Sequence, residues 1–222
     1  MMFSFKSLAI AAGIAFAAIS SVAATPLPCS TCDASTTTGT YVQEKSLVYV
    51  LEKAKYDITP VVVKFKSITK ETCTVEHVTP LVEELKVVLT GCIGNLHALV
   101  GVELDVLLLT SAGVRVTIDV VAGLVADILI LVFGALSFVL SLVEGIDVVI
   151  FTTLCTLFAV VGGLVGTILL AVLTLCGGVL GNLAGAIFFI LKDVEVIIAV
   201  IKTLNVSACI NLLGLVNVHV AI

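Results

Sequence analysis

The side chains that could do chemistry in this sequence are few and far apart. Cys29 and Cys32 form a Cys-x-x-Cys pair, which acts as a redox centre where a helix N-terminus lowers a thiol pKa. No βαβ pattern follows this pair, so a structural disulfide is favoured over catalysis. His77 and His97 have no partner at metal-ligand spacing, which favours two solvent-facing or hydrogen-bonded histidines over a zinc site.

The sequence also lacks the familiar catalytic motifs. It contains no GxSxG, HExxH or P-loop sequence, and no GxGxxG after a strand. The pair Glu83-Glu84 falls in the first turn of a predicted helix, where the helix dipole stabilises acidic side chains, so it needs no catalytic explanation. We therefore expect no enzymatic activity, no cofactor and no metal site.

The sequence contains candidate residues for two kinds of covalent modification, N-glycosylation and disulfide bonding. Asn205-Val206-Ser207 is an N-glycosylation sequon, although such triplets also occur by chance. The chain has seven cysteines, and connectivity cannot be deduced from spacing. The disulfide candidates are Cys29, Cys32, Cys73 and Cys92. The remaining three, Cys155, Cys176 and Cys209, lie in apolar surroundings and are expected to be buried free thiols.

The composition indicates a chain that must bury a large apolar surface. The residues are 60% hydrophobic and only 12% charged, and the net charge is −5 with a single Arg. This composition argues against a nucleic acid as partner, because the phosphates of nucleic acids attract basic patches. Trp is absent, so the chain cannot build the Trp belt found at the edges of many membrane proteins.

The first segment resembles a secretory signal peptide. Lys6 supplies a positive start, residues 8–19 form a short apolar core, and the small residues 22–24 form a cleavage site, so residues 1–24 are predicted to be removed. The alternative is an uncleaved anchor, but the apolar core is shorter than the roughly 20 residues of a membrane span. Residues 25–40 are rich in Ser, Thr and Pro and are predicted to be disordered.

Residues 41–110 are predicted to form amphipathic helices. Apolar residues recur at steps of three and four from Leu47 to Ile68, and Pro60 should either kink this helix or split it in two. A second helix is predicted from about Pro80 to about Leu109, with Thr79 as its N-cap.

Residues 111–222 form a more hydrophobic part that still has a helical period. A thin polar stripe follows steps of three and four: Ser111, Arg115, Asp119, Gly123, Asp127, Gly134, Ser137, Ser141 and Glu144. We expect Arg115 to pair with Asp119 across one turn. Asp127 within an apolar run would suggest a functional site in a membrane protein, but the stripe favours the wet edge of a helix.

The central feature of this part is residues 148–191, which contain no charged residue and no His. As one helix the run would be about 66 Å long, far more than one membrane crossing needs. A helical hairpin is expected, turning near either Gly162-Gly163 or Gly177-Gly178. Glycines at small-xxx-small spacing are candidates for close helix packing. They are Gly162, Gly166, Gly177, Gly181 and Gly185.

The predicted fold class is therefore all-α. It is a bundle of amphipathic N-terminal helices and Gly-rich hydrophobic C-terminal helices or hairpins, following a cleaved signal peptide. The abundance of Val and Ile leaves a β-rich fold open, but the spacing of the polar stripes favours helix.

This layout resembles the small secreted structural proteins of mushroom-forming fungi, in which a hydrophilic first half precedes a very hydrophobic second half. The resemblance covers the full length and rests on layout, with no specific motif. It implies a place in the extracellular matrix or hyphal cell wall and a role in adhesion and aerial growth. The chain is not similar to the hydrophobins themselves, which have eight cysteines with an adjacent pair.

The leading hypothesis is thus a secreted, non-enzymatic structural protein of the cell wall or extracellular matrix. Its partners would be further copies of itself, hydrophobic surfaces or cell-wall components, with membrane lipid as an alternative. The second hypothesis is an integral membrane protein with two to four C-terminal helices. The third is a carrier of an apolar ligand.

Overall fold

The described part of the chain is built from helices. The computed structural model describes residues 46–144, 147–177, 180–191 and 194–212. The helices are α3 (Leu47–Lys66), α4 (Val75–His97), α5 (Leu104–Leu107), α6 (Ile118–Val143), α7 (Val148–Leu175), α8 (Leu180–Leu191), α9 (Glu195–Thr203) and α10 (Ser207–Leu212). These residues form no strand and only an isolated bridge between Leu109 and Arg115, so the all-α class is confirmed there. The predicted signal peptide and the segment 25–40 lie outside the described residues.

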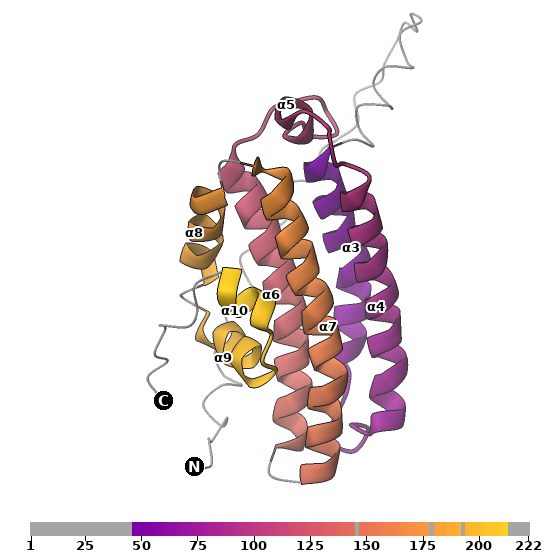
Figure 1. Ribbon diagram of the computed structural model, residues 1–222. Helices are drawn as coiled ribbons and strands as arrows, with labels where there is room; N and C mark the ends of the chain where they lie inside the picture. The colour runs from indigo at the N-terminus through magenta and orange to yellow at the C-terminus, as the bar shows by residue number, and fades with distance from the viewer. Residues whose placement is uncertain (1–45, 145–146, 178–179, 192–193, 213–222) are drawn as a thin grey trace, which may run out of the picture.

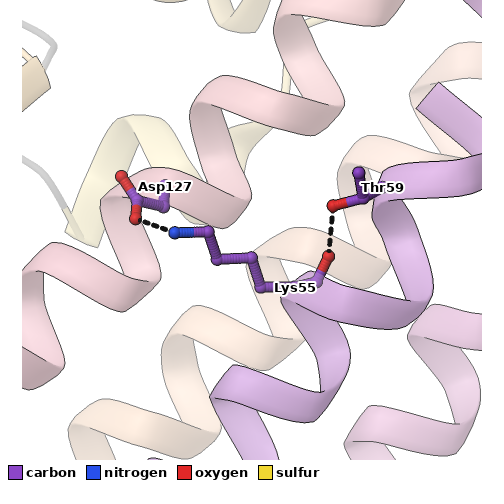
Figure 2. Close-up of polar contacts among 3 residues, drawn as sticks. All are labelled: Lys55, Thr59 and Asp127. Atoms are coloured by element: carbon purple, nitrogen blue, oxygen red, sulfur yellow. Dashed lines mark hydrogen bonds and ion pairs between the residues drawn. The ribbon is translucent and has the colours of Figure 1, made fainter. Parts of the chain in front are cut away.

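Helix α3 begins at a buried serine. The Ser46 hydroxyl accepts a hydrogen bond from the Tyr49 N–H and donates one to the Leu109 carbonyl, so it caps α3 and fastens the loop after α5. Pro60 lies inside α3 without dividing it. The residue directly before Pro60, Thr59, donates from Oγ1 to the carbonyl oxygen of Lys55, four positions back, at 2.7 Å (Figure 2).

Helix α4 begins and ends earlier than the sequence predicts. Its N-cap is Thr74, whose side chain accepts from the His77 N–H, and Pro80 lies inside the helix. The prediction of a Thr79 cap and a helix reaching Leu109 was therefore wrong. Pro80 is the sixth residue of α4, so its missing N–H removes one i→i−4 hydrogen bond from the helix without ending it. The helix ends at His97, and Gly101 then adopts a positive φ of 86° before the short α5.

The long helices lie in layers, as Figure 1 shows. α3 and α4 pack side by side, α3 packs along α6, and α4 packs along α7. On the other side, α8 and α9 pack against α6, and α10 packs against α7. Helices α6 and α7 thus form a middle layer between the α3/α4 pair and helices α8–α10 (Figure 1). A helix that is apolar all round is expected in such a position, because both of its flanks are covered.

The core joins the amphipathic and hydrophobic parts of the sequence. Phe65 of α3 and Phe158 of α7 meet edge to face, with ring centroids 6.4 Å apart and an interplanar angle of 76°. Both rings are fully buried, as is Phe133 of α6. The two parts therefore share one hydrophobic core instead of folding separately.

The predicted polar stripe is only partly a helix edge. α6 begins at Ile118, so Ser111 and Arg115 precede it, and Arg115 pairs with Asp105 at 2.7 Å instead of Asp119. Asp119 is exposed and Asp127 is half-exposed, but Ser137 is buried at 6% exposure. The stripe fails at Ser137 because α6 is covered on two flanks.

The turn of the hydrophobic hairpin lies near Gly177. α7 continues unbroken through Gly162 and Gly163 to Leu175, so the earlier of the two predicted turns was wrong. Gly177 has a φ of 59°, which L-residues other than Gly rarely adopt, and α8 begins at Leu180. At its other end α7 is capped by Asp147, whose carboxylate accepts from the Val149 and Ile150 N–H groups at 2.7 and 3.2 Å.

Candidate interaction surface

The outward side of α7 carries no charge along the whole helix. Its exposed residues recur at steps of three and four, as expected for one face of a helix. We call this set the α7 stripe; it consists of Thr152, Thr156, Val160, Gly163, Thr167, Leu170 and Thr174. Val160 and Leu170 are 50% and 51% exposed, so large apolar side chains face solvent in the same row as the threonines.

The threonines of the α7 stripe are less polar than their composition suggests. Thr152 and Thr156 donate to the carbonyl oxygens of Val148 and Thr152 at 2.8 and 3.0 Å. Thr167 and Thr174 make the same bond to the residue four positions back. Each hydroxyl proton is therefore engaged within α7, which reduces what the stripe offers to water or to a polar partner.

Further apolar side chains are exposed on α8 and at the start of α7. Phe189 is 64% exposed and Ile190 is 37% exposed. Val148 and Val149, in the first turn of α7, are 80% and 74% exposed. Exposed apolar side chains are ordinary when scattered singly, but these lie in a run of sequence with no charged neighbour between residues 148 and 191.

Three of the ion pairs in the described residues lie on α3 and α4. Ion pairs join Lys53 to Asp57 within α3 at 2.5 Å and Lys64 of α3 to Glu84 of α4 at 2.7 Å. Within α4, Lys86 pairs with Glu83 at 2.8 Å. The helices therefore differ in chemistry: α3 and α4 present a surface with ion pairs, whereas α7 and α8 have no charged residue.

One ion pair crosses from the charged layer to the middle layer. Lys55 Nζ of α3 lies 2.6 Å from Asp127 Oδ2 of α6 (Figure 2), and the two side chains are 36% and 44% exposed. The polar residue that interrupts the apolar sequence of α6 thus has a partner on α3. This arrangement favours a structural role for Asp127 over a catalytic one.

Two hollows on the surface are small. One, of about 190 Å³, lies between the end of α4 and the end of α7. It is lined by Leu96, His97, Val100, Thr167, Leu170, Ala171, Thr174 and Leu175. The other, of about 270 Å³, lies between α3 and α4. Ligand pockets usually measure about 300–1,000 Å³, so neither hollow supports the carrier hypothesis.

The predicted packing glycines have different surroundings. A Cβ built on Gly162 would lie 2.5 Å from Val206 Cγ2, and one on Gly166 would lie 2.6 Å from Ala208 Cβ. These two glycines let α10 and the residue before it approach α7 closely. Gly177 forms the turn after α7, whereas Gly185 of α8 is exposed with nothing near it. Gly181 lies in α8, and its surroundings are outside the described contacts.

The other predicted site residues are dispersed. His77 and His97 are both exposed on α4, and no group of three potential metal ligands occurs in the part of the chain described. Cys73 and Cys92 are buried free thiols, as are Cys176 and Cys209, and Cys155 is a half-buried one. Cys29 and Cys32 lie outside the described residues. Asn205 is exposed between α9 and α10.

Burial controls the chemistry of these thiols. Desolvation raises the pKa of Cys92 and of Cys176 to about 11, and that of Cys209 to about 12. It also raises the pKa of Cys73 and Cys155 above the ordinary value. A raised pKa leaves little thiolate at neutral pH, so these cysteines act as small apolar side chains and not as nucleophiles.

Comparison of the chain with known protein families, with curated proteins and with solved structures finds no match.

Sequence reasoning missed two features of this region. The first is the α7 stripe: the sequence pattern did not predict that the threonines and Gly163 would form one exposed row. The partners of Gly162 and Gly166, Val206 and Ala208, had no local signal, because they meet α7 only through tertiary packing. Ser46 did have one: a serine directly before an apolar helical pattern is a typical N-cap.

Proposed function

We propose that this chain is a secreted, non-enzymatic structural protein of the cell wall or extracellular matrix. It acts by adsorbing to apolar surfaces or to further copies of itself through the uncharged outer surface of α7 and α8. The proposal includes removal of residues 1–24 during secretion. It agrees with the resemblance to the small secreted structural proteins of mushroom-forming fungi.

The observation that carries the proposal is the uneven distribution of charge. Val160 and Leu170 are about half exposed in the α7 stripe, and no charged residue occurs between positions 148 and 191. Covering apolar area is worth roughly 25 cal/mol per Å², so contact with an apolar surface is favourable. The α3/α4 layer remains hydrated in such a contact, which gives an adsorbed film a wettable side.

The adsorption test uses the full chain produced by a secreting eukaryotic cell. N-terminal sequencing of protein recovered from the medium should begin at Thr25, and the protein should form a film on polystyrene, measured as adsorbed mass. Leu170→Lys and Val160→Lys should each reduce the adsorbed mass several-fold. The matched control is Val63→Lys on α3, since Val63 is 61% exposed on the charged layer and should tolerate the change.

Two results would contradict the proposal. The first is a wild-type protein that stays monomeric in the medium and leaves polystyrene uncoated. The second is an equal loss of adsorbed mass from Val63→Lys and from the α7 variants, because adsorption would then have no preferred face.

The integral membrane alternative is favoured by one observation. α6 and α7, with 26 and 28 residues, are long and apolar enough to cross a membrane. However, the charged α3/α4 layer lies along both helices, and charged side chains in a bilayer core are costly. Insertion would require this layer to separate from α6 and α7. Alkaline carbonate extraction tests this alternative: spanning helices keep the protein in the membrane pellet, and a secreted protein is released.

A further inference from the structure

We propose that Asn205 carries an N-linked oligosaccharide, and that this glycan lies level with the middle of α7, so that a glycosylated bundle cannot have α7 across a bilayer. The first half of this inference rests on the proposed secretion. The second half rests on the position of the α9–α10 turn against α7.

Asn205 occupies a helix-ending turn that holds it outward. Its φ is 50°, and it is the non-glycine residue with a positive φ in the described chain. Its N–H donates to the Lys202 carbonyl at 3.0 Å, and the N–H of Val206 donates to the Ile201 carbonyl at 3.1 Å. These two bonds define a Schellman cap, in which the left-handed position takes Gly or Asn. Asn205 is exposed, whereas Val206 is buried at 5% exposure.

The sequon is accessible on both sides of this buried valine. Ser207, which supplies the sequon hydroxyl, is exposed at the first position of α10. In the transfer step, Asn205 Nδ2 forms a bond to the anomeric carbon of a sugar held on a polyprenyl diphosphate. The bond from that carbon to the diphosphate oxygen breaks, the polyprenyl diphosphate leaves, and the amide loses one proton to the transferase. The co-reactant is therefore a lipid-linked oligosaccharide of the secretory lumen.

The packing of Val206 determines where the glycan lies along the axis of α7. Val206 Cγ2 lies 2.5 Å from the Cβ position of Gly162, which is near the middle of α7 (Val148–Leu175). At about 1.5 Å per residue, Gly162 lies about 20 Å from either end of the helix. The hydrocarbon core of a bilayer extends about 15 Å to each side of its centre. Asn205, one residue from Val206, would then lie within the hydrocarbon if α7 spanned a membrane.

The experiment expresses the full chain in a secreting eukaryotic cell and compares gel mobility before and after peptide N-glycosidase treatment. The wild type should show one glycan that the glycosidase removes. Asn205→Gly and Ser207→Ala should both abolish it. Asn205→Gly is the matched variant, because glycine is the preferred residue at this left-handed position and keeps the cap.

A second acceptor separates failure of this inference from failure of secretion. Lys70→Asn places the sequence Asn-Glu-Thr at positions 70–72, in the exposed loop between α3 and α4. If this variant gains a glycan and the wild type has none, the chain enters the lumen but Asn205 is not a site, and the inference is overturned. If neither is modified, both this inference and the proposed secretion fail.

The last experiment tests whether the glycosylated protein is inserted in a membrane. Wild-type protein glycosylated at Asn205 should be recovered from the soluble fraction after alkaline carbonate extraction. Recovery of glycosylated protein in the membrane pellet would overturn the conclusion that the glycan and a spanning α7 exclude each other.

Discussion

Lys55 and Asp127 connect α3 to α6 through an ion pair of 2.6 Å between residues 72 positions apart in the sequence. Both side chains remain about 40% exposed, so water screens their attraction. We predict a coupling free energy of about 0.2–1 kcal/mol from a double-mutant cycle of Lys55→Met and Asp127→Asn, measured by urea unfolding. The coupling should decrease at 0.5 M salt.

The Lys53–Asp57 pair provides the comparison for this cycle. It lies within α3 and does not join two layers, so its coupling should be about 0.3–0.5 kcal/mol. A coupling above about 2 kcal/mol at Lys55–Asp127, unchanged by salt, would mean that the pair is desolvated and would contradict the exposure described here.

The close approach at Gly162 predicts opposite effects from neighbouring substitutions. Gly162→Ala should lower the free energy of unfolding by about 1–2 kcal/mol, because its Cβ collides with Val206 Cγ2 and the collision outweighs the helix propensity of alanine. Gly163→Ala should raise it by up to about 1 kcal/mol, since nothing lies within 4 Å of that Cβ. Urea unfolding midpoints measure both.

A compensating substitution checks the cause of the Gly162 effect. Val206→Ala removes the colliding methyl group, so Gly162→Ala should cost less in that background than in the wild type. An equal cost in the two backgrounds would show that Val206 does not determine the effect.

Ser46 should matter more than its position at the start of α3 suggests. Ser46→Ala removes the cap on the Tyr49 N–H and the bond to the Leu109 carbonyl, and the site is fully buried. We expect a loss of about 1–2 kcal/mol in the free energy of unfolding. Ser67→Ala at the exposed end of α3 should change it by less than about 0.5 kcal/mol. Equal effects would remove the argument for a special role of Ser46.

The buried cysteines predict a loss of stability in alkali. In the unfolded chain a thiol titrates near pH 8.5, but burial raises the pKa of Cys209 to about 12. The folded state therefore binds the proton more tightly, so the full stability is present below about pH 8.5 and decreases as the pH rises from there toward 12. Unfolding midpoints measured between pH 7.5 and 10.5 should show this decrease.

Cys209→Ala tests which group is responsible. The variant should have a shallower decrease with pH than the wild type, whatever its stability at neutral pH. Thiol labelling at pH 8, mapped by mass spectrometry, should modify Cys155 before Cys209, because Cys155 is only half-buried. Faster labelling of Cys209 in the folded protein would contradict its burial.

The sequence predicts the helices well where one face is polar and poorly where both flanks are covered. The apolar steps from Leu47 to Ile68 correspond to α3 and its buried face. The polar stripe of α6, in contrast, predicts an exposed Ser137, and this serine is buried. Periodicity shows which residues can face water, but it cannot show how many neighbours a helix will acquire.

Helix ends and polar partners were harder to predict for a related reason. Arg115 was expected to pair with Asp119, but α6 begins after Arg115 and the arginine reaches Asp105 in the preceding loop. The turn at Gly177 was among the predicted positions because a glycine pair is costly inside a helix, and in the structure Gly177 has a positive φ that glycine adopts readily. The α7 stripe faces outward because α4 and α10 cover other faces of α7. No local sequence pattern shows which faces of a helix its neighbours will cover.

The middle position of α6 and α7 also affects how the protein is made. Helices α8–α10, which cover one flank of this layer, leave the ribosome after α7. Until α8–α10 have been synthesised, the hydrophobic helices α6 and α7 keep one face exposed in the nascent chain, and such exposure promotes aggregation. We therefore expect the nascent chain to depend more on chaperones than a bundle whose first helices already close its core.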